Sequence, residues 1–152
     1  MTAFFTSLRT ENPDLPIGAA GFCWGGLHAI MLTHDTAETR TAQGKPLVNA
    51  AFAAHPSNVS VPADIQKVRR PLSIAVGDED AVMALKQVKE AKGILEGMQG
   101  VESEVVIFPG ARHGFSIRAS RSKPDSKETK QAREAEEQAL AWFKKHFAAV
   151  KP

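Results

Sequence analysis

The stretch IGAAGFCWGG at residues 17–26 carries the strongest structural signal in the sequence. Its first six residues are apolar or small without alternation, which is typical of a strand buried on both faces of a parallel sheet. The residues that follow, up to about His34, indicate a helix. Gly21 and Gly25 flank Cys23 in the pattern Gly-x-Cys-x-Gly, which is typical of a sharp turn that carries a nucleophile between a strand and a helix.

The residue types in this turn have a physical reason. Neighbours two positions before and after a nucleophile crowd its strained backbone, so both are expected to be small, as Gly21 and Gly25 are. The turn puts Cys23 at a helix N-terminus, where free amides and the helix dipole favour the thiolate. The backbone amide of Trp24 would point at an oxyanion developing nearby. The motif alone leaves a nucleophile and an inert buried cysteine as open interpretations of Cys23.

The composition is that of one ordinary globular domain, residues 1–152. The chain is 43% hydrophobic and 24% charged, which excludes a wholly disordered protein. The net charge of +2 argues against a nucleic-acid partner, which would need a concentrated basic face. One cysteine excludes an internal disulfide framework and a multi-cysteine metal site.

Further apolar runs alternate with helical patterns along the chain. This alternation predicts right-handed crossovers and a mostly parallel sheet of about four strands, covered by helices. The predicted strands are 17–22, 48–54, 71–76 and 104–108, and the predicted helices are 24–34, 62–68, 80–98 and 126–149, the last capped by Asp125 with Glu128 three residues on.

Acidic residues and a histidine follow directly on two of these strands. Asp78, Glu79 and Asp80 come after the third predicted strand, and His113 comes after the fourth. Because the carboxyl ends of parallel strands form the active-site edge of such sheets, we expect these side chains to lie near Cys23.

In that arrangement His113 would take the proton of the Cys23 thiol, or pair with the thiolate as an imidazolium. One acid would orient the ring and stabilise its positive form. The residues themselves do not choose among the three acids, since Asp78 or Asp80 could instead cap the helix that follows.

The remaining histidines and glycines predict no metal or cofactor. His28 and His34 are six residues apart, whereas two ligands on one helix face need a spacing near four. His55 follows a predicted strand and could reach the same sheet edge, although a structural loop residue is the commoner role there. His146 is expected to be solvated on the last helix. No glycine-rich loop matches a phosphate or dinucleotide site.

The N-terminal residues have no basic start followed by a long apolar stretch, so no secretory signal is predicted. The apolar runs are also far shorter than the 18 residues that suggest a membrane span. We therefore expect a cytoplasmic protein without a membrane partner.

Together these stretches resemble the dienelactone hydrolase family. The resemblance extends over essentially the whole chain, in order, through GFCWGG at 21–26, AAHPS at 53–57, GDEDAVM at 77–83, FPGARHGFSIR at 108–118 and AWFKKHF at 141–147. It implies a three-layer α/β-hydrolase fold with a Cys-Asp-His triad. Cys23 and His113 match the family positions directly, and the last residue of the Gly-x-x-Asp turn makes Asp80 the acid.

The resemblance also implies an activity. A small ester or lactone would be hydrolysed through an acyl-thiol intermediate at Cys23, with the Trp24 amide in the oxyanion hole and no cofactor. An arginine that follows the histidine in the family corresponds roughly to Arg118, which would bind substrate; a plain surface position is the alternative.

Family members carry several strands before this turn, whereas here only one helix precedes the first strand. We therefore expect an N-terminally truncated domain that lacks the second oxyanion amide. Strand 17–22 would lie at an open sheet edge that could pair with a second copy of the chain as a homodimer. Two other functions stay open: a catalytically silent interaction module, and a thiol redox sensor.

Overall fold

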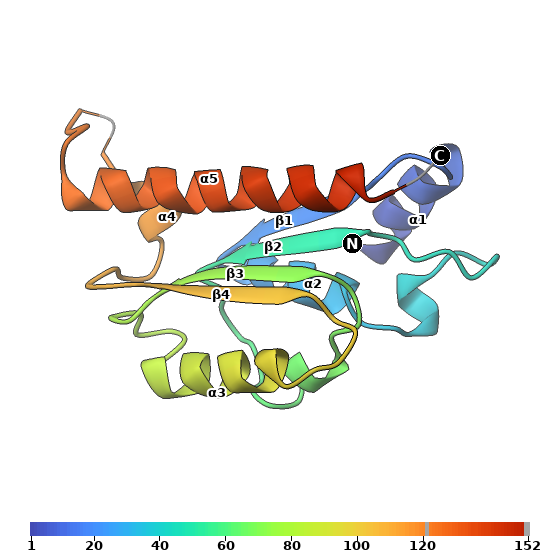
Figure 1. Cartoon of the computed structure of the whole chain (residues 1–152), viewed down its shortest axis with the longest axis horizontal. Helices are drawn as coiled ribbons and strands as arrows, with labels where there is room; N and C mark the ends of the chain where they lie inside the picture. The colour runs from blue at the N-terminus through green and yellow to red at the C-terminus, as the bar shows by residue number, and fades with distance from the viewer. Residues whose placement is uncertain (121, 151–152) are drawn as a thin grey trace.

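Four parallel strands make the central layer of the structure (Figure 1). The computed structural model describes residues 1–120 and 122–150. The predicted parallel sheet is confirmed, and each strand lies within two residues of its expected range. In spatial order, which follows the chain, the strands are β1 (Gly18–Phe22), β2 (Ala50–Ala54), β3 (Leu72–Gly77) and β4 (Ser103–Phe108).

Helices cover both faces of this sheet, which confirms the predicted three layers. The long helix α5 (Lys127–Ala148) lies across one face, and α2 (Trp24–Leu32) and α3 (Leu85–Glu96) lie against the other (Figure 1). A further helix, α1 (Thr2–Glu11), precedes β1, and the one-turn helix α4 (Phe115–Arg118) precedes α5. Among the described residues no helix is both long and apolar enough to cross a membrane.

The burial of the inner strand β2 explains why apolar and polar residues do not alternate in its sequence. All five of its residues are buried. Ala51 and Ala53 pack into the core beneath α2 and α3, while Phe52 and Ala54 pack into the core beneath α5. A strand with apolar neighbours on both faces has no polar side, so the helical layers around it outweigh the poor strand propensity of alanine.

The start of α5 differs from its prediction by one residue. Ser126, not Asp125, is the N-cap, and its Oγ accepts a hydrogen bond from the backbone N–H of Thr129 at 3.2 Å. Both residue types are good N-caps, so the sequence pattern alone does not separate two neighbours.

The stretch at 80–84 also departs from the predicted helix 80–98, because α3 begins only at Leu85. The Asp80 carboxylate accepts hydrogen bonds from the backbone N–H groups of Val82 and Met83, which holds a turn there. The predicted helix 62–68 is likewise shorter, and only Ile65–Lys67 forms a 3₁₀ turn.

The prediction that His146 is solvated is wrong. The residue is only 9% exposed, and its ring lies 4.2 Å from that of Trp142, one helical turn earlier on the inner face of α5. Burial lowers the pKa of His146 below its ordinary value.

Candidate active site

Cys23 occupies the sharp turn between β1 and α2. Its φ of 51° lies in the left-handed region, which residues other than glycine rarely adopt. The backbone around it is held from both sides: its N–H donates to the Ala54 carbonyl at 3.2 Å, and its own carbonyl accepts from Gly26 and Ser57, each at 3.0 Å. The neighbouring loop thus fixes the strained conformation that presents the thiol.

The two glycines of the motif have different surroundings. A Cβ on Gly21 would lie 2.1 Å from the Gly25 carbonyl oxygen, so α2 can approach β1 only over a glycine. A Cβ on Gly25 would meet no atom within 4 Å among the described residues. The prediction that both positions are crowded therefore holds for Gly21 and is wrong for Gly25.

His113 lies against Asp80 at the carboxyl end of the sheet. The two carboxylate oxygens are 3.0 and 3.1 Å from His113 Nδ1, and the Asp80 side chain is fully buried. This pairing uses Nδ1 of the imidazole, which leaves Nε2 for another partner.

The other two acids that follow β3 have different contacts. Asp78 accepts a hydrogen bond from the Gly110 N–H at 2.6 Å, which ties the loop after β3 to the loop after β4. Glu79 is exposed and forms an ion pair with Arg112 at 3.5 Å. Of the three acids that the sequence left open, the one that contacts His113 is Asp80.

His55 is the hydrogen-bond partner of the thiol. Its Nδ1 lies 3.4 Å from Cys23 Sγ, and its Nε2 lies 2.8 Å from Ser116 Oγ. A ring nitrogen of His113 also lies within 4.8 Å of the sulfur, and the two imidazole centroids are 5.2 Å apart. The site therefore holds two histidines beside one thiol, where the sequence pattern predicted one.

The protonation state of His55 follows from its environment. The residue has no exposed surface. Burial, with a smaller effect from the neighbouring His113, lowers the pKa of His55 from 6.5 to about 4. His55 is therefore neutral at pH 7 and carries one ring proton.

The strand register is the feature that would have identified His55 as the neighbour of Cys23. Phe22 of β1 pairs with Ala54 of β2, so the next residues along the two strands are Cys23 and His55. The sequence placed His55 after a strand without showing that this strand neighbours β1.

Trp24 and Arg118 lie at the edge of this cluster. Trp24 is the first residue of α2, a position whose amide has no intrahelical acceptor, and its indole is exposed. Arg118 ends α4 and lies directly over Gly114. It is exposed and lines a pocket of about 450 Å³ together with His113, so this cation borders the same hollow as the histidine.

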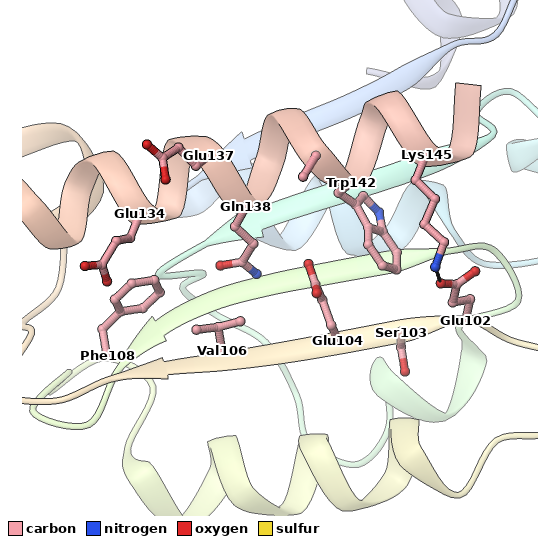
Figure 2. A pocket seen from close by; sticks show the side chains of 11 residues that line it. Glu102, Ser103, Glu104, Val106, Phe108, Glu134, Glu137, Gln138, Trp142 and Lys145 are labelled. Carbon is pink, nitrogen blue, oxygen red and sulfur yellow. Dashed lines mark hydrogen bonds and ion pairs between the residues drawn. The ribbon is translucent and has the colours of Figure 1, made fainter. Parts of the chain in front are cut away.

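A second groove lies away from these groups. It runs between β4 and α5, has a volume of about 620 Å³, and is lined by several acidic side chains (Figure 2). Lys145 reaches across one end of it to pair with Glu102. None of Cys23, His55 and His113 lines this groove, so the titratable cluster and the wider hollow are separate features.

Burial of His55 predicts a loss of stability in acid. The unfolded histidine binds a proton as the pH falls below 6.5, while the folded one does so only near 4, so the unfolded state gains protons first. We expect the contribution of His55 to the free energy of unfolding to stay constant above pH 6.5. Below that pH the contribution should fall, by about 3 kcal/mol as the pH approaches 4. Urea unfolding at pH 7.5 and pH 4.5 measures the difference.

The control for this experiment is His55→Asn, because asparagine tolerates the positive φ of 37° at this position. The variant should lose less stability than the native chain over the same pH interval. An equal loss in both proteins would assign the acid sensitivity to other groups, among them His34, whose pKa is also lowered by burial.

Comparison with known proteins finds relatives of this chain among curated hydrolases. It is 24% identical over 147 residues to "Hydrolase pyvD" of Aspergillus violaceofuscus, covering 97% of this chain and 54% of that protein. It is 26% identical over 142 residues to the "Carboxymethylenebutenolidase homolog" of Rattus norvegicus, covering 92% and 53%. The chain thus spans about half the length of these curated relatives.

Solved structures share the architecture. A thermophilic esterase of Thermogutta terrifontis, Est2, superposes with a TM-score of 0.74 at 17% identity, over 95% of this chain and 61% of that one. At this identity the likeness shows the fold, which is the α/β-hydrolase fold.

The family assignment rests on the sequence as a whole. The model of the dienelactone hydrolase family matches residues 3–147, a range that contains the Cys23 turn, the Asp80 turn and the His113 loop. This chain belongs to the dienelactone hydrolase family.

Proposed function

We propose that this chain hydrolyses small esters or lactones through a triad of Cys23, His113 and Asp80. The observation that carries the proposal is the buried Asp80–His113 contact at 3.0 Å, beside a cysteine held in a strained turn. A carboxylate on Nδ1 leaves Nε2 of the histidine available as a base for the thiol, which supports nucleophilic catalysis by cysteine.

The reaction begins when His113 Nε2 takes the thiol proton and the Cys23 thiolate attacks the substrate carbonyl carbon. The Trp24 amide stabilises the oxyanion of the tetrahedral intermediate. The intermediate collapses to an acyl-thiol, and the leaving alkoxide takes the proton from His113. Water, deprotonated by the same nitrogen, then attacks the acyl-thiol and releases the acid and the free thiol.

His55 holds the resting thiol in this proposal. With the ring proton assigned to Nε2, His55 donates to Ser116 Oγ, and its Nδ1 accepts a hydrogen bond from the Cys23 S–H. A neutral imidazole with a pKa of about 4 is a weak base, so the proposal gives the role of general base to His113 and not to His55. The thiol turns from His55 to His113, whose ring nitrogen is within 4.8 Å, when the substrate arrives.

Arg118 supports a preference for substrates that carry a carboxylate. The residue lines the pocket that His113 also lines, and a positive charge there would orient an anionic substrate. The two named relatives above are a hydrolase and a carboxymethylenebutenolidase homolog, which agrees with ester or lactone chemistry.

The test is to trap the acyl-enzyme. The protein is mixed with p-nitrophenyl acetate, quenched in acid after a few seconds, and digested for mass spectrometry with EDTA present throughout. We expect one acetyl group on the peptide that contains Cys23, the single cysteine of the chain.

Protein alkylated beforehand with iodoacetamide is the control, because it blocks this one thiol without any change of sequence. An acetyl group that survives alkylation, or none in the native protein, contradicts the proposal. Absence of the adduct with rapid alkylation of Cys23 would favour a thiol redox sensor, and slow alkylation would favour a silent interaction module.

Two expectations about the protein's surroundings stay predictions. The first is a homodimer through β1, which lies at one margin of the sheet and carries an exposed Phe22. Light scattering of the purified chain would test it, since an unpaired strand edge favours association. The second is a cytoplasmic location.

A further inference from the structure

Three side chains that can bind a metal ion meet at the active-site edge of the sheet. Cys23 comes from the turn after β1, His55 follows β2, and His113 follows β4. One ligand atom from each lies within 4.8 Å of the other two. They are separated by at least 32 residues in the chain, so no sequence spacing reveals the group.

We propose that this cluster binds one Zn²⁺ ion through Cys23 Sγ, His55 Nδ1 and His113 Nε2, with water as the fourth ligand. One thiolate and two imidazoles form a donor set that suits zinc and disfavours Mg²⁺ and Ca²⁺, which prefer oxygen. Binding releases the thiol proton to solvent, so the sulfur enters the site as a thiolate.

The distances fit a tetrahedral ion with little movement. Bonds of about 2.3 Å to sulfur and about 2.0 Å to nitrogen place neighbouring ligand atoms roughly 3.5 Å apart in a tetrahedron. Cys23 Sγ and His55 Nδ1 are already separated by 3.4 Å. The third ligand lies within 4.8 Å of both, so a shift of roughly 1 Å by the His113 ring closes the site.

Both histidines have a partner on the nitrogen that faces away from the ion. His113 Nδ1 contacts the buried Asp80 carboxylate, and His55 Nε2 contacts Ser116 Oγ. Such outer contacts fix the orientation of the ring and raise its affinity for the metal. The Asp80 carboxylate and the Cys23 thiolate together balance the two positive charges of the ion.

Zinc in this position would block the thiol. The metal would occupy the nucleophile and the nitrogen that the proposed function gives to the base, so the zinc-bound protein would be unable to react at Cys23. The binding itself depends on the three ligands and not on whether the chain hydrolyses esters.

The test uses the full chain without an affinity tag, stripped with chelator and titrated with Co²⁺ as a spectroscopic substitute for Zn²⁺. We expect one Co²⁺ per chain, with a thiolate-to-cobalt charge-transfer band and the intense visible bands of a tetrahedral site. One equivalent of Zn²⁺ should remove both sets of bands.

Variants separate this site from other histidines. Cys23→Ser and His113→Gln should each weaken Zn²⁺ binding by more than the roughly 10–100-fold loss expected for Asp80→Asn, which changes only the outer contact. His146→Gln is the matched control, since it removes a buried histidine on α5 and should leave the affinity unchanged. Circular dichroism checks that each variant is folded.

A measurement on the unaltered protein keeps the proposal testable if a variant fails to fold. Zn²⁺ should slow alkylation of Cys23 by iodoacetamide, EDTA should restore the rate, and Mg²⁺ should have no effect. The proposed site is wrong if Zn²⁺ does not change the rate of alkylation, or if folded Cys23→Ser binds zinc with unchanged affinity. Acetylation of Cys23 is measured without metal, so failure of the hydrolase proposal and failure of the zinc site are separate results.

Discussion

Replacement of Asp80 by asparagine is expected to slow ester hydrolysis by about 10³–10⁴-fold, as for the acid of comparable triads. The carboxylate accepts the Nδ1–H of His113 and stabilises its protonated form. An amide can instead present its NH₂ to Nδ1, which favours the tautomer with the proton on Nε2 and leaves no acceptor for the Cys23 proton.

This variant should keep its fold. The carboxylate oxygen that accepts from the Val82 and Met83 N–H groups can be replaced by the amide oxygen of asparagine. We therefore expect kcat to fall with KM nearly unchanged, because the lost contact matters when charge develops on His113. Steady-state kinetics on the activated ester, with urea unfolding alongside, measures both.

Two neighbouring acids provide matched controls. Glu79→Gln removes only an exposed ion pair with Arg112, and Asp78→Asn keeps an acceptor for the Gly110 N–H, so each should retain activity within about twofold. A loss in either control as deep as in Asp80→Asn would assign the acid role elsewhere in the turn.

The two inner strands were predictable because burial on both faces leaves a direct mark on composition. The same expectation is wrong for β1 and β4, which lie at the margins of the sheet and are only partly buried. β2 and β3 are buried along their whole length, and their runs of apolar residues follow from that. Because the strands are parallel, the polar turns that follow them lie at one edge of the sheet. These features depend on the layers of the fold and not on atomic detail.

The contacts within the site were less predictable. Which histidine touches Cys23 depends on which strand neighbours β1, and the register that pairs Phe22 with Ala54 decides it for His55. Apolar runs carry no information on that order. The local errors have a similar origin, since Asp125 and Ser126 are adjacent residues with the same capping chemistry, and packing decides between them.

Gly21→Ala is expected to unfold the protein or destabilise it by at least about 3 kcal/mol, the upper end for overpacked interiors. The new methyl would lie 2.1 Å from the Gly25 carbonyl oxygen and 2.5 Å from its carbonyl carbon. These are backbone atoms of α2, so no side-chain rotation relieves the contact. The helix must move away from β1, and the turn that presents Cys23 moves with it.

Gly25→Ala tests the same motif from the other side. Its methyl would enter open space, and alanine favours helix more than glycine does, so stability should stay the same or rise by up to about 1 kcal/mol. Urea unfolding of both variants compares them directly. If Gly25→Ala were as damaging as Gly21→Ala, the symmetric crowding expected from the Gly-x-Cys-x-Gly pattern would be correct. If only Gly21→Ala is damaging, the turn depends on one glycine, because the Cβ position of Gly21 faces the Gly25 backbone while that of Gly25 faces open space.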